Sequence, residues 1–357
     1  MSNQDKPLVS VIIPTHNRGQ LLVRAIQSVL AQTFSDFEII VVDDGSIDNT
    51  KEVVRGFKDP RIRFFHHEQN RGPSAARNTA IRAARGRYVT FLDSDDEYAP
   101  EKLQEQMCAL GKNEGERDSI VIVTGTLHLF DFPTMPRKIW PVINLRPCPE
   151  GHIYESFWAL KRIKVIASML VSRECLEKVN LFDEALRASE FWDLGIRLAK
   201  NCRYEVVEKP LYIVHADSTV RAWNIDTRIP AIRRILSKYS GELASRPRSA
   251  ARLRANMGVL QLNAGLRNEA RQTFLQALHL WPLSPVNYAH FFSSLLPTGM
   301  SRLLAKKGFS GVLGLRWLSM HTRRIKWVRH NRTASSSTGI EANPSNLKGG
   351  PEGETAL

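Results

Sequence analysis

The feature that most constrains the fold is a regular alternation of short apolar runs with helix-like segments near the start of the chain. Leu8–Pro14 and Phe37–Val42 are rich in Val and Ile and carry few polar residues, as strands buried on both faces do. Between them, residues 21–30 place Leu, Val, Ile and Ala at the spacing of one helix face. Strand, helix and strand in this order predict a parallel sheet covered by helices.

The same alternation continues to about residue 92. The further elements expected are a helix, a strand, a helix and a strand, over Thr50–Phe57, Arg61–His66, Ala75–Ala84 and Tyr88–Leu92. The predicted fold class is therefore α/β, a mostly parallel sheet with helices on both faces. Since a chain of 357 residues usually holds about two domains, a second region is expected beyond the sheet.

The rest of the chain divides into zones by composition. We expect an α/β domain over residues 7–222, a helical extension over 225–297, a basic amphipathic segment over 298–332 and a disordered tail over 333–357. In the extension, small and aromatic residues between 255 and 282 have the spacing of one tetratricopeptide-like hairpin. Ordinary helices with small residues at a crossing explain the same pattern.

The formal net charge of +14 is concentrated late in the chain. Residues 302–332 contain nine Lys and Arg residues and no Asp or Glu. Because Leu, Trp and Val are interleaved with these charges, the segment suits an anionic membrane surface better than a nucleic acid. A solvated basic helix is the alternative. We therefore expect a peripheral membrane contact here and no nucleic-acid partner.

Two further features bear on the cellular compartment. The N-terminus lacks a charged and apolar leader, and no apolar run approaches the ~20 residues of a membrane span. The four cysteines are widely spaced and form no CxxC pair, which argues against a zinc site or a disulfide framework. These features predict a cytoplasmic protein, free or peripheral at the inner face of the plasma membrane.

Two acidic clusters follow continuous apolar strands. Asp43 and Asp44 come after the second strand, and Asp93, Asp95 and Asp96 come after the fourth. Ligands of parallel sheets bind beyond the carboxyl ends of the strands, so we expect both clusters at one edge. Crowded carboxylates favour a compensating Mg²⁺ or Mn²⁺ ion, which in turn binds diphosphates. Alternatively, the first cluster is only a turn and the second only a helix N-cap.

Four segments carry a resemblance to a known family. They occur in the order Val9–Asn17, Val41–Thr50, Asn70–Asn78 and Phe91–Asp96, and together span most of residues 8–100. As an ordered set they closely resemble glycosyltransferase family 2, whose fold is GT-A, and a weaker match continues to about residue 221. The resemblance implies an inverting transferase that uses a nucleotide-sugar donor.

The resemblance implies donor-binding roles for matched positions. Thr15 would lie beside the base and ribose, and Asp44 would accept a hydrogen bond from the base, most simply from the N3–H of uracil. Arg71 and Arg77 fall in the block that lines the nucleotide pocket. For Arg77, a structural pairing with nearby carboxylates is an equally good hypothesis.

The resemblance also implies a metal site. Asp93 and Asp95 match the family's DxD motif, in which Asp95 would bind Mn²⁺ or Mg²⁺ and Asp93 would hold the ribose or the metal's water shell. Asp96 would support them or cap a helix. His215, after the last predicted strand, would lie near the metal and the diphosphate. A divalent cation on both phosphates stabilises the leaving nucleoside diphosphate.

Leu181–Glu184 and Glu190–Leu198 resemble the family's acceptor-side block but depart from its pattern at one position. There an acidic pair precedes a helix, and its second acid is the usual catalytic base. This chain has Glu190 in the first position and Phe191 in the second. A phenylalanine cannot take a proton, so Glu190 is our candidate base and Asp193 the second candidate. Alternatively, the activity has decayed and the protein binds donor as a scaffold.

The sequence thus predicts an enzyme that moves a sugar, from a UDP-sugar for preference, to a hydroxyl of a glycan or lipid-linked acceptor. The family resemblance suggests cell-surface polysaccharide biosynthesis as the setting. A nucleotidyltransferase that makes sugar nucleotides would need a glycine-rich triphosphate loop, which Pro14–Gly19 does not supply. A catalytically impaired nucleotide-sugar-binding or scaffold protein remains the alternative.

Overall fold

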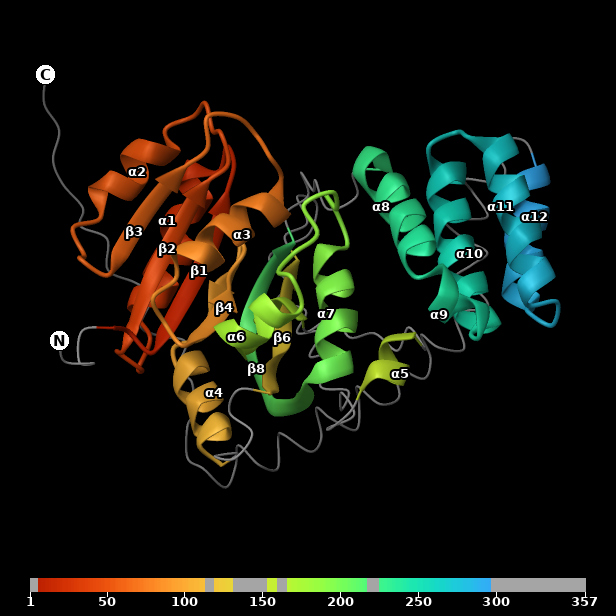
Figure 1. Ribbon diagram of the computed structural model, residues 1–357. Helices are drawn as coiled ribbons and strands as arrows, with labels where there is room; N and C mark the ends of the chain where they lie inside the picture. The colour runs from red at the N-terminus through yellow and green to blue at the C-terminus, as the bar shows by residue number, and fades with distance from the viewer. Residues whose placement is uncertain (1–5, 113–118, 131–152, 159–165, 217–224, 297–357) are drawn as a thin grey trace, which may run out of the picture. The chain divides into compact units, whose positions relative to one another are not determined.

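The computed structural model describes residues 6–112, 119–130, 153–158, 166–216 and 225–296. By its internal contacts the chain divides into two compact units, Met1–Asn287 and Tyr288–Leu357. The first unit holds the sheet and the helices that cover it (Figure 1).

The described strands form one mixed sheet in the order β3-β2-β1-β4-β7-β6-β8-β5. Their bounds are β1 (Val9–Thr15), β2 (Phe37–Asp43), β3 (Ile62–His66), β4 (Tyr88–Phe91), β5 (Glu97–Tyr98), β6 (Ile120–Phe130), β7 (Leu170–Ser172) and β8 (Arg203–Ala216). Strand β1 pairs in parallel with both β2 and β4, and β2 pairs in parallel with β3. Strands β7 and β5 run antiparallel to their neighbours. The predicted mostly parallel α/β sheet is therefore confirmed.

The helices of the sheet region alternate with the strands. They are α1 (Gly19–Leu30), α2 (Thr50–Gly56), α3 (Pro73–Ala83), α4 (Lys102–Gly111), α5 (Tyr154–Trp158), the short 3-10 helix η3 (Ile166–Ser168), α6 (Arg173–Lys178) and α7 (Glu190–Asn201). The three helices and the strands expected up to residue 92 are confirmed, with bounds that differ by one or two residues.

Alternate residues of the central strands point to opposite faces of the sheet, and each face carries its own core. Val11 and Ile13 of β1 pack with α1, α2 and α4, whereas Ile12 between them packs on the opposite face, with α3, α6 and α7. All three side chains are fully buried. The continuous apolar runs seen in the sequence thus follow from the burial of both faces.

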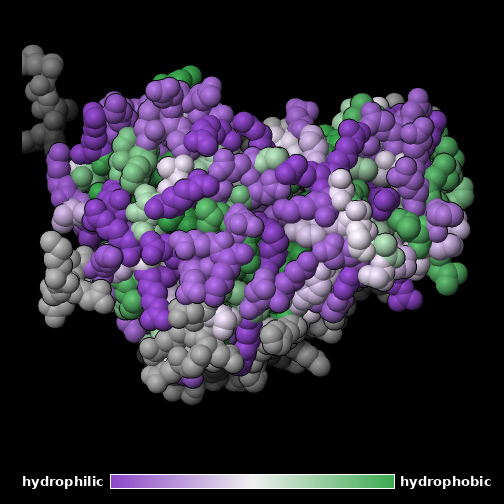
Figure 2. Space-filling view, viewed as in Figure 1, coloured by the Kyte–Doolittle hydropathy of each residue, from purple (hydrophilic) through white to green (hydrophobic). Residues whose placement is uncertain are grey.

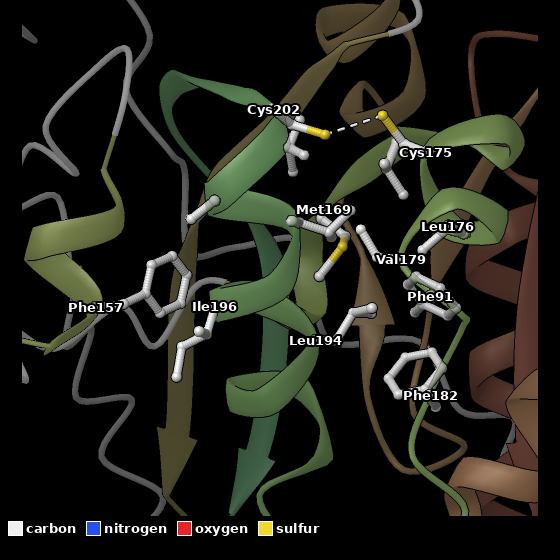
Figure 3. Packing of buried hydrophobic residues seen from close by; sticks show 14 of the residues in the cluster. Phe91, Phe157, Met169, Cys175, Leu176, Val179, Phe182, Leu194, Ile196 and Cys202 are labelled. Carbon is white, nitrogen blue, oxygen red and sulfur yellow. Dashed lines mark hydrogen bonds between the residues drawn. The ribbon is translucent and has the colours of Figure 1, made fainter. Parts of the chain in front are cut away.

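The core on the α3 side contains an aromatic and sulfur-rich region beneath α6 and α7 (Figure 3). Phe91 of β4 contacts Phe182 edge to face, with ring centroids 5.4 Å apart. The buried thiols of Cys175 and Cys202 lie 2.9 Å apart, a proximity that their separation in sequence did not predict. By contrast, Cys108 is exposed.

The first described helix of the C-terminal region begins at residue 225. The elements of this region are α8 (Ile225–Lys238), α9 (Ser240–Ala244), α10 (Pro247–Asn263), α11 (Arg267–Leu280) and α12 (Pro285–Leu295). Ile235 and Tyr239 belong to the core of the α3 side, so that core runs on into the extension without a break. Gly258 of α10 lies against Phe274 of α11, where a β-carbon would come within 2.6 Å of the ring.

Several expectations about the C-terminal part stay predictions. The boundary near residue 222, the basic segment 298–332 and the tail 333–357 lie outside the described residues. Helices α10 and α11 pack against each other, and the tetratricopeptide-like hairpin stays a prediction. Among the described helices, none combines the length and the apolar composition that a membrane span requires.

Candidate donor and acceptor site

The predicted donor residues follow strands that lie side by side. Thr15 ends β1, Asp44 follows β2 and Asp93 follows β4, and β1 lies between the other two. Because these strands are parallel, all three residues lie at the same edge of the sheet. The hydroxyl of Thr15 is buried and has no hydrogen-bond partner within the described part of the chain.

The loops after β1 and β2 are joined by hydrogen bonds between backbone and side chains. The Asn17 amide donates to the Ser46 hydroxyl (2.8 Å), and the Ile47 amide donates to Asn17 Oδ1 (2.9 Å). The Gly19 amide donates to Asp48 Oδ2 (3.1 Å). The two loops therefore form one rigid rim above the carboxyl ends of the strands.

Asp44 is buried in this rim and holds a third loop. Its carboxylate accepts the backbone amides of Arg71 (2.9 Å) and Gly72 (2.7 Å). Gly72 has a φ of +96°, a left-handed conformation that glycine adopts without steric cost. The segment Asn70–Asn78 is therefore held against the second strand by a charged acceptor. A nucleotide base that donates a hydrogen bond to Asp44 would therefore use the same carboxylate as the Arg71 and Gly72 amides.

His67, for which the sequence suggests no role, is a neighbour of Asp44. Its Nδ1 lies 2.8 Å from Asp44 Oδ1, and its Nε2 lies 2.9 Å from the hydroxyl of Thr79 in α3. No motif marks this histidine. The pairing of β2 with β3, which sets Asp43 opposite His66, is the signal that could have found it.

The acidic cluster after β4 is balanced by arginines. Asp93 Oδ1 lies 2.6 Å from Arg77 Nη2, and Asp95 Oδ1 lies 2.9 Å from Arg18 Nη1. Burial raises the pKa of Asp95 above its usual value, Arg18 acts in the opposite direction, and the charge of Asp93 raises the pKa further. Carboxylates are thus crowded at this point of the rim, where a nearby cation stabilises their ionised forms.

Asp96 is more deeply buried than its neighbours. Burial, with the charges of Asp93 and Asp95, raises the pKa of Asp96 well above its usual value. Its carboxylate accepts the backbone amide of His215 (3.0 Å), which ties the end of β8 to the cluster. The His215 ring turns to Glu97, with Nε2 2.8 Å from Oε1.

Among the described residues, no three His, Cys, Asp or Glu side chains converge closely enough to hold a metal by themselves. Mg²⁺ bound with nucleotides usually has only one or two protein carboxylates, and phosphate oxygens and waters complete its shell. Asp93 and Asp95 supply that number, and the arginines that now neutralise them show that a cation is favoured here. The donor set therefore fits a divalent ion bound together with a diphosphate.

Arg77 joins this cluster to the acceptor-side block. Its side chain is 4% exposed, and Nη1 lies 2.9 Å from Glu190 Oε1 while Nη2 contacts Asp93. The hypothesis of a structural pairing with carboxylates therefore describes its observed contacts. The structure thus brings Glu190, the candidate base, to the donor edge of the sheet.

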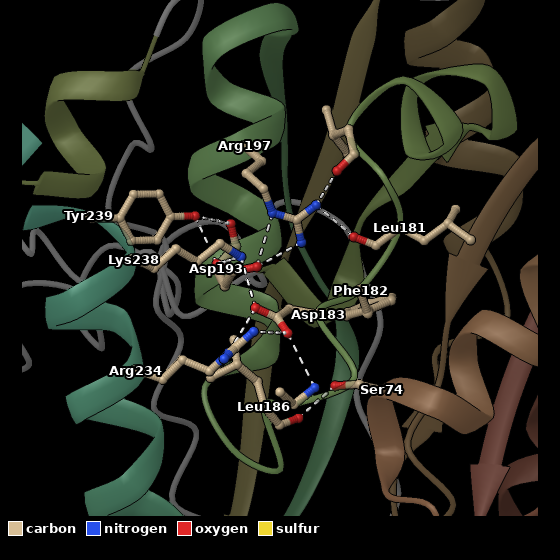
Figure 4. A network of polar contacts seen from close by, with 12 residues as sticks. Ser74, Leu181, Phe182, Asp183, Leu186, Asp193, Arg197, Arg234, Lys238 and Tyr239 are labelled. Carbon is tan, nitrogen blue, oxygen red and sulfur yellow. Dashed lines mark hydrogen bonds and ion pairs between the residues drawn. The ribbon is translucent and has the colours of Figure 1, made fainter. Parts of the chain in front are cut away.

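Asp193, the second candidate base, lies in a different environment (Figure 4). It is fully buried, and Arg197 Nη2 (2.7 Å), Lys238 Nζ (2.6 Å) and the hydroxyl of Tyr239 (2.8 Å) surround its carboxylate. A carboxylate with two cations and a hydroxyl around it is poorly placed to accept a proton from an acceptor. This geometry favours a structural role for Asp193.

Arg71 lies at the exposed side of the site. Its backbone is held by Asp44, and its guanidinium lies 3.3 Å from Glu184 of the acceptor-side block. Glu184 also accepts the side-chain amide of Asn78 (2.9 Å). The side chain of Arg71 is 47% exposed, so a ligand phosphate could reach it.

Comparison with known proteins identifies the family. Residues 10–167 match the model of glycosyl transferase family 2. WcaA of Escherichia coli K12, a glycosyl transferase named for colanic acid biosynthesis, is 45% identical over 223 residues, which cover 61% of this chain and 76% of WcaA. The succinoglycan biosynthesis protein ExoO of Rhizobium meliloti is 34% identical over 250 residues, 66% of this chain and 69% of ExoO. The chain belongs to glycosyltransferase family 2.

Other relatives of this family 2 glycosyltransferase are matched only in part. WfgD of Escherichia coli, a UDP-Glc:α-D-GlcNAc-diphosphoundecaprenol β-1,3-glucosyltransferase, is 43% identical over 109 residues, 30% of this chain and 43% of WfgD. The aligned part covers 17% of an uncharacterized glycosyltransferase of Rickettsia felis. The predicted family and enzyme class are thus confirmed.

Solved structures confirm the GT-A fold. Residues 1–349 of TarS from S. aureus superpose with a TM-score of 0.56 at 19% identity, over 84% of this chain and 91% of that chain. At this identity the likeness establishes the fold alone. TarS has also been solved with UDP and with UDP-GlcNAc.

Proposed function

We propose that this family 2 glycosyltransferase transfers a sugar from a UDP-sugar to a hydroxyl of a glycan or lipid-linked acceptor, with inversion at the sugar carbon. The setting proposed is cell-surface polysaccharide biosynthesis, as the names of WcaA and ExoO suggest. The observation that carries the proposal is the convergence of Asp93 and Glu190 on the single guanidinium of Arg77. It sets a donor-side acid beside an acceptor-side acid, as one in-line displacement requires.

The donor would lie along the rim from Asp44 to Asp95. The uracil ring of the donor would form a hydrogen bond with Asp44, which is buried in the rim. The ribose would lie near Thr15 and Asp93. Asp93 and Asp95, with His215 nearby, would hold Mn²⁺ or Mg²⁺, which when bound stabilises the charge of the departing diphosphate. Arg71 would reach the phosphates from the exposed side of the site.

Glu190 would act as the general base. It begins α7, its side chain is 13% exposed, and Arg77 holds one of its oxygens. It would take the proton of the acceptor hydroxyl as that oxygen attacks the anomeric carbon. Proton transfer by a positioned side chain contributes roughly 10²- to 10⁴-fold in rate.

We propose a lipid-linked diphosphate as the acceptor class, on the strength of the WfgD name. A cytoplasmic location with peripheral contact to an anionic membrane would accompany it. Helix α12 supports this, because Tyr288, Phe292 and Leu295 recur at i, i+4 and i+7 and are 44–59% exposed. Figure 2 shows apolar side chains on the surface of this helix. The acid-free basic segment 302–332 follows in the sequence.

The test is UDP release from UDP-glucose, UDP-GlcNAc and UDP-galactose, with Mn²⁺ or with chelator. We expect one sugar to give slow UDP release that chelator abolishes, and to raise the melting temperature only when Mn²⁺ is present. UDP binding without release from any sugar, with or without a GlcNAc-diphosphate lipid acceptor, would support the scaffold alternative.

A further inference from the structure

Phe191 occupies the position at which the family carries an acid, and its ring lies against Arg77. The guanidinium carbon of Arg77 is 4.4 Å from the centroid of Phe191. Arg77 is also 5.6 Å from the ring centroid of Phe182, near the outer limit of a cation–π contact. Phe191 is therefore the principal aromatic surface under this guanidinium.

The Phe191 ring is itself fixed by its neighbours. It contacts Phe91 and Phe182 edge to face, with centroid separations of 5.6 Å and 5.3 Å. Phe91 ends β4, separated from Asp93 by Leu92, and is buried. The orientation of the ring is thus tied to the strand that precedes Asp93.

A guanidinium held over a fixed ring is restrained in orientation, and because the group is planar its two N–H₂ groups point in defined directions. The Nη2 group of Arg77 donates to Asp93 Oδ1, and its Nη1 group donates to Glu190 Oε1. Among the described residues no hydrogen bond engages Glu190 Oε2. The Arg77 guanidinium therefore orients the Glu190 carboxylate and leaves its second oxygen available to accept a proton.

We infer that Arg77 and Phe191 are positioning residues, Phe191 serving as a platform that sets the plane of Arg77, and Arg77 orienting Glu190 as the base. This rests on the proposed function, in which Glu190 takes the proton. An acid at residue 191 would add a third carboxylate to a guanidinium that now serves two. The phenylalanine instead makes the contact that keeps the remaining acid in place.

The test compares Phe191→Leu with Phe182→Leu, which removes a ring from the same aromatic cluster. The readouts are kcat for UDP release from the active UDP-sugar, the Kd for UDP with Mn²⁺, and the urea midpoint of unfolding. Loss of a buried cation–π contact predicts a roughly 2- to 30-fold lower kcat for Phe191→Leu. We expect its Kd for UDP to stay within about twofold of wild type, because Phe191 lies on the acceptor side.

Phe182→Leu should shift the urea midpoint by a similar amount with a clearly smaller loss of kcat. Phe191→Tyr, which keeps the ring, should restore kcat to near the wild-type value. Arg77→Lys keeps the charge but loses the planar guanidinium that donates to Asp93 and Glu190 at once. Its kcat should therefore fall by on the order of 100-fold, with weaker UDP binding as well.

Equal kcat losses in the two leucine variants would overturn the inference, as would a Phe191→Leu effect confined to UDP affinity. If Phe191→Leu does not fold, the comparison of Phe191→Tyr with Arg77→Lys decides: a tyrosine variant as impaired as the lysine variant would contradict the platform. A wild-type protein that binds UDP and releases none from any sugar refutes the proposed function instead.

Discussion

The donor side and the acceptor side of the site are built by different means. On the donor side, Asp44 is held by backbone amides and its neighbouring loops are bonded to one another. On the acceptor side, Glu190 and Asp193 are held by side chains from remote elements, Arg77 from α3 and Lys238 from α8. The donor rim is therefore fixed by backbone hydrogen bonds between loops at neighbouring strand ends, whereas the acceptor acids depend on side-chain contacts between helices. Substitutions on the two sides should differ in what they disturb.

The largest effect is expected for Glu190→Gln. The amide keeps the shape of the side chain and its contact with Arg77 but cannot take a proton, so kcat should fall by roughly 10²- to 10⁴-fold. Since the donor rim is untouched, the Kd for UDP should stay within about twofold, as measured by calorimetry. A variant with near wild-type kcat would remove Glu190 from the role of base.

The next largest effect is expected for Asp193→Ala, and on stability. Removing this carboxylate leaves Lys238 and Arg197 partly uncompensated in a buried place, which costs about 3–5 kcal/mol of unfolding free energy. Tyr239→Phe loses only a hydrogen bond and should cost about 1 kcal/mol. Urea denaturation measures both. An Asp193→Asn variant that stays folded yet loses as much kcat as Glu190→Gln would make Asp193 the base.

A smaller effect, on the opposite side of the comparison, is expected for Asp44→Asn. An amide cannot accept the Arg71 and Gly72 amides and a base N–H as a carboxylate does, and such charged hydrogen bonds contribute about 1.5–3 kcal/mol. UDP affinity should fall by roughly 10- to 150-fold, and kcat at saturating donor should change little. A loss of kcat with unchanged affinity would show that Asp44 belongs to the acceptor machinery.

The smallest effect concerns Asp183 and acid stability. Burial alone would raise its pKa, but hydrogen bonds from Arg234 and Lys238 lower the pKa of Asp183 from 3.8 to about 2. A lowered pKa stabilises the folded state above pH ~4, and this contribution is lost as the pH falls towards 2. Asp183→Asn should therefore be less stable than wild type at pH 5, and the difference should shrink between pH 4 and pH 2.

The matched control for this experiment is Glu174→Gln, which removes an exposed ion pair with Lys178. Such pairs contribute about 0–1 kcal/mol, so the urea midpoint of this variant should track wild type at every pH. A difference for Asp183→Asn that stays constant from pH 5 to pH 2 would mean that α8 does not stabilise the ionised carboxylate.

The donor side was largely predictable. The apolar runs of β1, β2 and β4 predict strands, and acids directly after parallel strands must lie at one edge of the sheet. The sequence could not distinguish a donor-binding Arg77 from one paired with carboxylates, because both need the same residue at the same place. The sequence also showed no sign of the contact between His67 and Asp44, because these residues are 23 positions apart and are brought together by strand pairing.

On the acceptor side, the sequence alone could not choose between two candidates for the catalytic base. Glu190 and Asp193 lie in the first turn of one helix, and the sequence offered both as the base. Tertiary packing gives the two residues different surroundings. Glu190 contacts Arg77 at the rim, whereas Asp193 is fully buried and contacts Lys238 of α8.

The chain by itself determined the alternation of strands and helices, the acids at the strand ends and the family, because these depend on local periodicity and ordered motifs. The tertiary structure decided that Arg77 joins Asp93 to Glu190, which is 113 residues away, and that Phe191 supports it. Side-chain contacts across such a distance depend on how the helices pack on the sheet, and local periodicity carries no record of that packing.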